Sequence, residues 1–433
     1  MAARLGGALS PDPGRLPQAS GDRRRTPSDR AHVTVLAPGL GGMGGTTRTV
    51  LNLADYLSRY YDVELVGVLR RRRRSFFPMP ARVMVTHLDD GHARLGFRWR
   101  LVRGLLARCP SILIHERDSR YAVFSLWTDL LLLNYLRRAT GVLITPGVGL
   151  NIVAARYAPF GVRTIGQEHM NLATKGAVLR ADIQRYYPRL DALAVLTERD
   201  RRDYSGLLRS APPLVARMPN AVPPLDGGRA DPTAKKVVAA GRLTQQKGFD
   251  RLIPAWSPIA RTHPDWCLEI YGKGPERGPL QELIDNHGLT DAIRLMGPTD
   301  RLGHAFAQSS IFVLSSRWEG LPMVILEAMS KGLPVVSFDC PTGPEEVVVN
   351  DRNGVLVPEG DVPAMTAALH HLIEDEELRA RLGNGALATA AEYDMEIIGQ
   401  KWLELIGGLL GQPSSASPTM VELREPSSGA ERR

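Results

Sequence analysis

The chain has 433 residues, 43% hydrophobic and 23% charged, so it is long enough for two or three domains of ordinary globular composition. Its net charge of +8 suits an anionic partner, but nucleic acid, a membrane surface and phosphorylated small molecules all qualify. Three dispersed cysteines (Cys109, Cys267, Cys340) argue against a disulfide framework or zinc site and for a reducing cytoplasm. The N-terminus lacks the apolar core of a signal peptide, and Tyr121–Leu136 is too short to span a bilayer.

Compositional changes along the chain predict its division into domains. Residues 1–30 and 412–433 are rich in residues such as Pro and Ser and show no periodicity, so we expect disordered tails. Between them we expect one domain over residues 31–225 and a second over residues 226–411, the second beginning in a linker rich in Gly, Pro and Asp.

The first domain begins with a strand at His32–Ala37, a glycine-rich loop that contains Gly44, Gly45 and Arg48, and a helical pattern. Missing side chains in such a loop let backbone amides approach a phosphate, which indicates a nucleotide-binding turn. The alternative is a tight turn whose glycines serve packing alone.

The first half continues as alternating strands and helices. Five arginines, Arg70–Arg74, follow the second strand; they could touch anionic lipid or a phosphorylated acceptor, or form a solvated surface loop. His169 lies among polar residues at a strand end, where open α/β sheets bind ligands, although a lone histidine is often structural. We expect a helix at Phe124–Arg138 and further strands at Val63–Leu69, Ser111–His115, Val142–Thr145, Thr164–Gln167 and Asp191–Thr197.

The second half restarts with a strand at Lys236–Ala240, followed by a loop that carries Arg242 and Lys247. These side chains offer a forked and a point positive charge, which would suit a leaving diphosphate; a basic surface turn is the alternative. Further strands are expected at Cys267–Tyr271, Ile293–Met296, Ile311–Leu314, Val335–Asp339 and Val355–Val357, and helices at Val362–Leu382 and Met395–Leu410.

Two carboxylates mark the segment after Ile311–Leu314. Glu319 lies in a loop, and Glu327 lies on the second turn of a helix that Pro322 begins. Between them the first helical amides, of Met323 and Val324, are available to an anion. This combination suits a sugar joined to a nucleotide, with Glu327 holding ribose hydroxyls and Glu319 facing the sugar. The alternative is a solvated helix with two incidental glutamates.

The Glu-x7-Glu arrangement of Glu319 and Glu327, continuing into Gly343-x-x-Glu346, closely resembles family 4 glycosyltransferases, which are retaining enzymes of the GT-B fold. The resemblance extends from His32 to Leu410. It implies an α/β GT-B fold, in which two Rossmann-like domains with parallel sheets face each other across an interdomain cleft. It also implies transfer of a hexosyl group from a nucleoside diphosphate sugar, most commonly a UDP-sugar, to an acceptor hydroxyl with retention of configuration.

The resemblance also assigns roles to residues of this chain. The expected catalytic residues are Glu319, Arg242, Lys247 and His169. The expected donor-binding residues are Glu327, Gly320, Leu321, Met323, Val324, Gly44 and Gly45.

We expect no cofactor and no metal, because the chain contains no Asp-x-Asp pair and no cysteine or histidine cluster with ligand spacing. The expected partners are the nucleotide sugar and a polysaccharide or lipid-linked acceptor, with peripheral contact to an anionic membrane as a further possibility and no nucleic acid. Such a cytoplasmic enzyme would serve polysaccharide or glycolipid synthesis. The alternatives are a glycoside hydrolase, a GT-B sugar-nucleotide epimerase and a non-catalytic nucleotide-sugar-binding protein.

Overall fold

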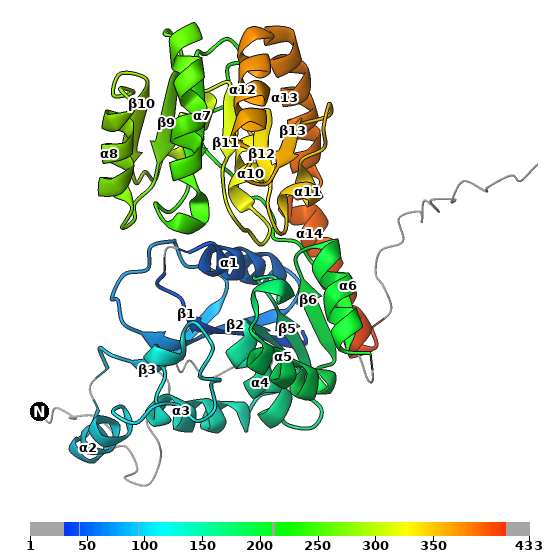
Figure 1. Cartoon of the computed structure of the whole chain (residues 1–433). Helices are drawn as coiled ribbons and strands as arrows, with labels where there is room; N and C mark the ends of the chain where they lie inside the picture. The colour runs from blue at the N-terminus through cyan, green and yellow to red at the C-terminus, as the bar shows by residue number, and fades with distance from the viewer. Residues whose placement is uncertain (1–29, 43, 94, 210–212, 413–433) are drawn as a thin grey trace, which may run out of the picture.

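The computed structural model describes residues 30–42, 44–93, 95–209 and 213–412. These residues form two α/β domains, drawn one above the other in Figure 1, each built on a parallel sheet. The tails expected at residues 1–30 and 412–433 lie outside the described residues except for Arg30 and Gln412.

The N-terminal domain contains a seven-stranded parallel sheet with the order β3-β2-β1-β4-β5-β6-β7. The direction of winding reverses between β1 and β4, and the loops after these strands diverge, which leaves a crevice where open α/β sheets bind ligands. The strands are β1 (His32–Gly39), β2 (Asp62–Arg70), β3 (Met84–Asp90), β4 (Val142–Pro146), β5 (Arg163–Gln167), β6 (Ala192–Val195) and β7 (Leu214–Arg217).

The C-terminal domain repeats this winding in a six-stranded parallel sheet with the order β10-β9-β8-β11-β12-β13. Its reversal lies between β8 and β11, so the loops that begin at Gly241 and Ser315 flank its crevice. The strands are β8 (Lys236–Ala240), β9 (Cys267–Tyr271), β10 (Ile293–Gly297), β11 (Ile311–Leu314), β12 (Val335–Asp339) and β13 (Gly354–Pro358).

Helices cover both sheets (Figure 1). Within the described ranges, none of them is long and apolar enough to cross a membrane. They are α1 (Gly45–Leu57), α2 (Phe97–Leu106), α3 (Leu126–Leu136), α4 (Val148–Tyr157), α5 (Ala177–Tyr186), α6 (Glu198–Leu207), α7 (Phe249–Thr262), α8 (Arg277–Asn286), α9 (Leu302–Ala307), α10 (Met323–Met329), α11 (Pro344–Val347), α12 (Val362–Glu374), α13 (Glu376–Ala391) and α14 (Met395–Leu410).

One predicted strand is wrong. Ser111–His115 forms no strand, and β3 supplies the edge of the sheet instead. The carboxylate of Asp129 accepts hydrogen bonds from the amides of Ile112 (2.7 Å) and Leu113 (3.3 Å). Because a side chain satisfies these amides, they do not enter a sheet ladder.

The predicted helix at Val362–Leu382 is two helices, α12 and α13. The side chain of Asp375 accepts a hydrogen bond from the amide of Leu378 (2.8 Å) and caps the second helix at its N-terminus. This aspartate has an extended backbone conformation, so the chain leaves the first helix before it enters the second.

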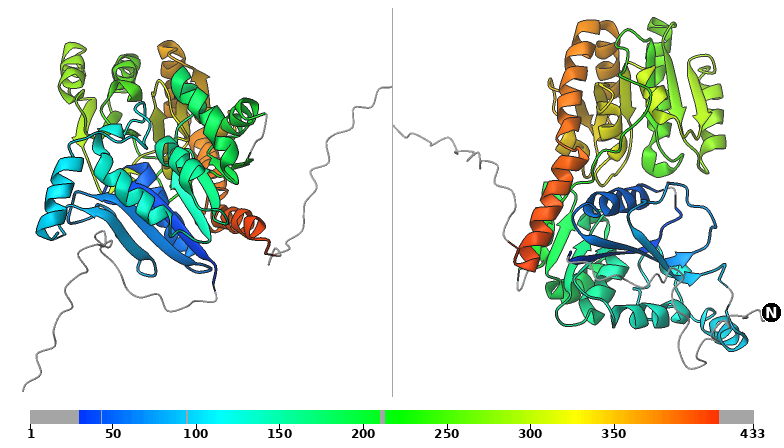
Figure 2. Two further views of the ribbon diagram at one scale, coloured as in Figure 1. Left: turned by 90° about the horizontal axis from the view of Figure 1, so that it is seen from below. Right: turned by 180° about the vertical axis from the view of Figure 1, so that it is seen from behind.

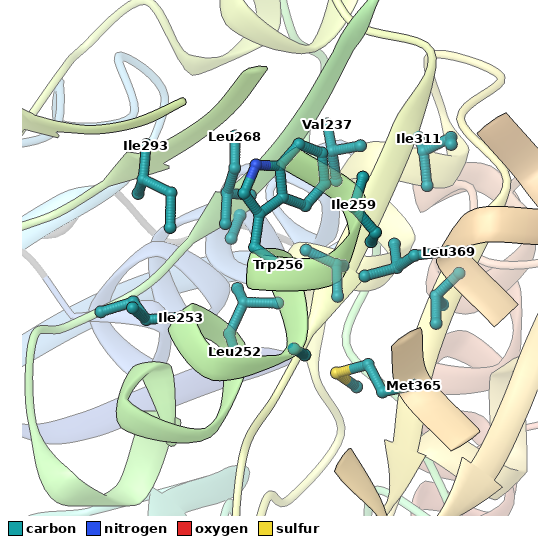
Figure 3. Packing of buried hydrophobic residues seen from close by; sticks show 14 of the residues in the cluster. Val237, Leu252, Ile253, Trp256, Ile259, Leu268, Ile293, Ile311, Met365 and Leu369 are labelled. Atoms are coloured by element: carbon teal, nitrogen blue, oxygen red, sulfur yellow. The ribbon is translucent and has the colours of Figure 1, made fainter. Parts of the chain in front are cut away.

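The core of the C-terminal domain is centred on Trp256 of α7, which is fully buried (Figure 3). Its indole packs between Leu268 of the sheet and Ile259 of its own helix, and Met365 and Leu369 of α12 complete the cluster. This packing holds the start of α7, and with it the loop that carries Lys247, against the sheet.

The last helix, α14, joins the core of the N-terminal domain. Ile398, Trp402 and Ile406 recur every four residues and are buried against residues such as Val33 and Leu53. Figure 2 shows this helix running down beside the first domain after α13 has covered the second. The division expected from the sequence counted residues 395–410 with the second domain, whereas their apolar face completes the first.

Candidate functional site

A buried ion pair lies at the crevice of the C-terminal sheet. The ammonium of Lys247 lies 2.5 Å from one carboxylate oxygen of Glu319, and the hydroxyl of Ser316 donates to the same oxygen at 2.5 Å. Glu319 is only 6% exposed. The sequence placed these two residues in separate loops, and the fold brings them into direct contact.

Gly248 allows this contact. Its φ is +65°, and a Cβ atom there would lie 2.0 Å from the carbonyl oxygen of Ser315. The Ser315 hydroxyl donates to the carbonyl of Lys247 at 2.9 Å, and the amide of Arg317 donates to the carbonyl of Gln246 at 2.8 Å. The loop after β8 is therefore bound directly to the loop after β11.

Arg242 lies on the same loop as Lys247 but remains exposed. Its guanidinium donates to the side-chain carbonyl of Gln246 at 2.9 Å. The Lys247 side chain passes over Gly241, where a Cβ would come within 3.2 Å of its methylene carbons. Both cations therefore lie along one short loop, as expected.

Glu327 of α10 forms an ion pair with Arg48 of α1 at 3.4 Å, across the two domains. Its side chain is 14% exposed, and burial raises the pKa of the carboxyl, while Arg48 lowers it. Arg48 also lies over the ring of Phe77, 5.6 Å from its centroid. Arg48, which the sequence placed in the glycine loop, thus reaches the other domain.

A cleft of about 940 Å³ opens beside Arg242. Gly44, Gly45 and His169 line it from the N-terminal domain, and Arg242 lines it from the C-terminal domain. A Cβ added at Gly44 or Gly45 would meet no atom within 4 Å. Tight packing therefore does not require glycine at these two positions, whereas the approach of a ligand to the backbone would benefit from it.

His169 follows β5 at the wall of this cleft. Burial lowers the pKa of its imidazole to about 3, with further contributions from Arg120 and Lys175, so the ring is neutral at physiological pH. Neither ring nitrogen has a hydrogen-bond partner within the part of the chain that the structure describes. The ring can therefore offer both a donor and an acceptor to a ligand.

Sequence reasoning missed the neighbour of His169. Glu168 is 2% exposed and pairs with the ammonium of Lys175 at 3.1 Å. It accepts a hydrogen bond from the side-chain amide of Asn151 at 3.0 Å and another from the hydroxyl of Tyr187. An acidic residue directly after a buried strand was the signal that could have identified it.

The N-terminal domain contacts the loop that contains Glu319 and Gly320. The side-chain amide of Asn171 donates to the carbonyl of Glu319, and a Cβ on Gly320 would lie 3.0 Å from the carbonyl oxygen of His169. Leu321, like Glu319, is buried, and Met323 and Val324 follow it as the first residues of α10. The structure thus brings the predicted catalytic residues to one domain junction, with part of the predicted donor loop covered.

The remaining motif residue, Glu346, joins the two domains. It accepts a hydrogen bond from the amide of Arg199 at 3.1 Å and lies 3.5 Å from the guanidinium of Arg217. Glu346 therefore links α11 of the C-terminal domain to the N-terminal domain.

Possible metal ligands lie elsewhere. Within the described ranges, the ligand atoms of His263, His370 and Glu374 lie within 4.8 Å of one another, at the end of α7 opposite Lys247. Sequence spacing did not reveal this group because it comes from two helices. The imidazole of His370 lies 3.2 Å from a carboxylate oxygen of Glu374, one turn further along α12, and the carboxylate is exposed.

Residues 227–388 match the family model described as glycosyl transferases group 1. An exopolysaccharide phosphotransferase of Streptomyces coelicolor is 34% identical over 86% of this chain, although the chain spans only 40% of that relative's length. The amylovoran biosynthesis glycosyltransferase AmsD of Erwinia amylovora is 27% identical over 86% of this chain and 99% of its own.

Among solved structures, TarM of S. aureus superposes with a TM-score of 0.70 at 16% identity, covering 87% of this chain and 99% of that one. The fold is therefore GT-B, which confirms the fold expected from the sequence. The matched domain and the relatives together support a GT-B glycosyltransferase.

Proposed function

We propose that this chain is a retaining glycosyltransferase that moves a hexosyl group from a nucleoside diphosphate sugar to a hydroxyl of a polysaccharide or lipid-linked acceptor. The region that matches the glycosyl transferases group 1 model contains Arg242, Lys247, Glu319 and Glu327. A UDP-sugar is our first choice of donor, since the TarM structure contains UDP. The named role of AmsD in amylovoran biosynthesis supports a polysaccharide acceptor.

The observation that carries this proposal is the Lys247–Glu319 ion pair beside the exposed Arg242. Negative charge builds up on the diphosphate as the bond to the sugar breaks, and preorganised cations lower the free energy of that transition state. An ammonium has three N–H donors, so contact with Glu319 leaves donors on Lys247 for phosphate oxygens. In this proposal Arg242 supplies the second charge, and the first amides of α10 add to it.

The carboxylates take different roles in the proposal. Glu319 faces the transferred sugar, where its charge and its contact with Lys247 orient the reacting centre. Glu327 holds the ribose hydroxyls, and Arg48 neutralises it when no donor is bound. We assign retention of configuration from the resemblance of the Glu-x7-Glu segment.

Donor entry would require movement of the domains. Asn171 and His169 lie on the backbone of Glu319 and Gly320, and Leu321 next to them is buried. We infer that the two domains separate to admit the nucleotide and close again around it, with α14 and the contacts of Glu346 keeping them associated.

A donor screen followed by product analysis tests the proposal. The full chain is incubated with UDP- and GDP-sugars, thermal shift identifies those that bind, and product analysis follows with polysaccharide and lipid-linked acceptors. We expect a glycosylated acceptor with the donor's anomeric configuration. Donor conversion without an acceptor would indicate the epimerase, and binding without turnover would indicate the binding protein.

We also propose that transfer needs no divalent cation, because Arg242 and Lys247 supply the charge that a metal would otherwise provide. Initial rates in EDTA should equal those with added magnesium or manganese. Loss of nearly all activity in the chelator, restored by metal, would refute stabilisation of the diphosphate by Arg242 and Lys247 alone.

A further inference from the structure

A second cavity, of about 900 Å³, lies within the N-terminal domain. The glycine loop after β1 forms one wall. Arg70 at the end of β2 and Arg71, Arg72 and Arg73 after it form another, with Arg120 beside them. We call this cavity the arginine pocket. Among the described residues, none of those that line it is acidic.

Only part of this positive charge is neutralised by nearby acids. Arg70 pairs with Asp90 at 3.1 Å, and Arg71 lies 3.3 Å from Asp89. Within the described ranges, the guanidinium groups of Arg72, Arg73 and Arg120 have no ion pair and no hydrogen bond. The first two arginines are therefore structural, and three cations remain available to an anion.

The loop that carries these arginines is fixed in place. The Ser75 hydroxyl donates to the carbonyl of Leu40 at 3.0 Å, and Arg70 donates to the carbonyl of Arg73 at 3.2 Å. A Cβ on Gly41 would lie 3.8 Å from the Cβ of Arg72, so the glycine loop packs against the base of that side chain. A fixed backbone reduces the entropy lost when guanidinium groups order around a ligand.

The arginine pocket opens onto the cleft described above. Gly44, Thr46 and Arg120 line both cavities. A molecule seated among the arginines can therefore extend past these residues toward Arg242 and His169, which line the cleft. The pocket is on the acceptor side of the proposed transfer.

We propose that the arginine pocket binds a phosphate or diphosphate group of the acceptor, held by Arg72, Arg73 and Arg120. Planar guanidinium groups pair with phosphate oxygens through two parallel hydrogen bonds, and three cations match a diphosphate. The extended surface of a bilayer could not enter a cavity of this size. The identity of the ligand as the acceptor rests on the proposed function.

Binding of inorganic pyrophosphate to the full chain tests the site without any turnover. Isothermal titration compares the wild type with R72Q/R73Q, with R242Q, and with R74Q, an exposed arginine of the same run outside the pocket lining. We expect R74Q to bind like the wild type and R72Q/R73Q to bind more weakly by on the order of tenfold or more, whereas R242Q should remove only the binding that the proposed donor site contributes.

Other results would overturn the proposal. Equal affinity in all four proteins, or no binding to the wild type, would contradict a site at these arginines, and a loss confined to R242Q would place pyrophosphate in the donor cleft. If R72Q/R73Q and R74Q equally lost sedimentation with phosphatidylglycerol vesicles while pyrophosphate binding did not change, the arginine run would contact membranes instead.

Competition identifies the source of the phosphate. A short-chain prenyl diphosphate and a soluble glycerol phosphate oligomer are each titrated against bound pyrophosphate, and displacement by either supports the site and names the acceptor class. Failure of both to displace it would contradict an acceptor role. Pyrophosphate binding that needs Arg72 and Arg73, without sugar transfer from any donor, would leave the site standing and refute only the transferase.

Discussion

Lys247 contacts Glu319 and shares its loop with Arg242, and in the proposed reaction both cations stabilise the departing diphosphate. Replacing Arg242 or Lys247 with Ala should lower kcat/KM. The loss of transition-state stabilisation should be about 2–4 kcal/mol, the scale for loss of one charge donor. Steady-state kinetics measures this. R251Q serves as the control, since Arg251 pairs with Glu359 instead of facing the crevice. If both variants fold and keep near wild-type turnover, Arg242 and Lys247 do not stabilise the departing diphosphate.

Substitutions of Glu319 and Glu327 should change different kinetic constants. Glu327→Gln should mainly raise KM for the donor, because ribose contacts persist from the ground state to the transition state. Glu319→Gln should mainly lower kcat, because its partner Lys247 acts as charge develops. The roles would have to be exchanged if steady-state kinetics showed the opposite pattern.

His169 should make the folded state sensitive to acid. Its pKa is about 3 in the folded chain, against about 6.5 for an ordinary histidine, so between these values the unfolded chain binds one more proton. Its contribution to stability is present above pH 6.5 and is lost as the pH falls toward 3, at up to about 1.4 kcal/mol per pH unit. H169Q should show a flatter dependence of unfolding free energy on pH over this range. Parallel curves for the two proteins would contradict the buried neutral ring.

At the scale of elements, the loops at the carboxyl ends of the strands depend on single glycines. Gly248→Ala should destabilise the chain and misplace Lys247, because its φ of +65° is unfavourable for alanine and the new Cβ would lie 2.0 Å from a carbonyl oxygen. Gly228→Ala is a matched control, with a φ of +76° and no atom within 4 Å of the new Cβ.

We expect Gly228→Ala to lower the free energy of unfolding by about 1 kcal/mol, the cost of a left-handed conformation for alanine. Gly248→Ala should lower it by several kcal/mol and should also lose most of its kcat. Thermal unfolding and steady-state kinetics measure both quantities. Equal losses of stability in the two variants would show that the close contact with Ser315 does not contribute to the cost of Gly248→Ala.

At the scale of the whole molecule, the C-terminal end of the chain stabilises the N-terminal domain. Trp402→Ala on α14 should cost about 3–5 kcal/mol, because it removes a large side chain that is 2% exposed in the first core. Hydrogen exchange should then quicken in β1 and α1 more than in β8 and α7. Ile397→Ala, on the same helix but 46% exposed, is the control. Faster exchange confined to the second domain would contradict this packing.

The sequence by itself determined most of the local elements and marked the candidate residues of the site. The buried strand Ile311–Leu314 was predicted at the bounds that the structure shows, because a central strand in a parallel sheet is a short, continuous apolar run. Arg242, Lys247, Glu319 and Glu327 were predicted as site residues from their charges beside the strand ends and from the resemblance of the Glu-x7-Glu segment, and their roles stay predictions.

Only the tertiary structure decided which of these residues meet, since contacts between distant segments leave no periodic signal in one sequence. The pairing of Arg48 with Glu327 spans 279 residues. Ser111–His115 was apolar enough to suggest a strand, but Asp129 satisfied its amides. The helix at Met395–Leu410 was predicted as part of the second domain, but its apolar residues are buried in the core of the first, a contact between distant segments that the sequence does not encode locally.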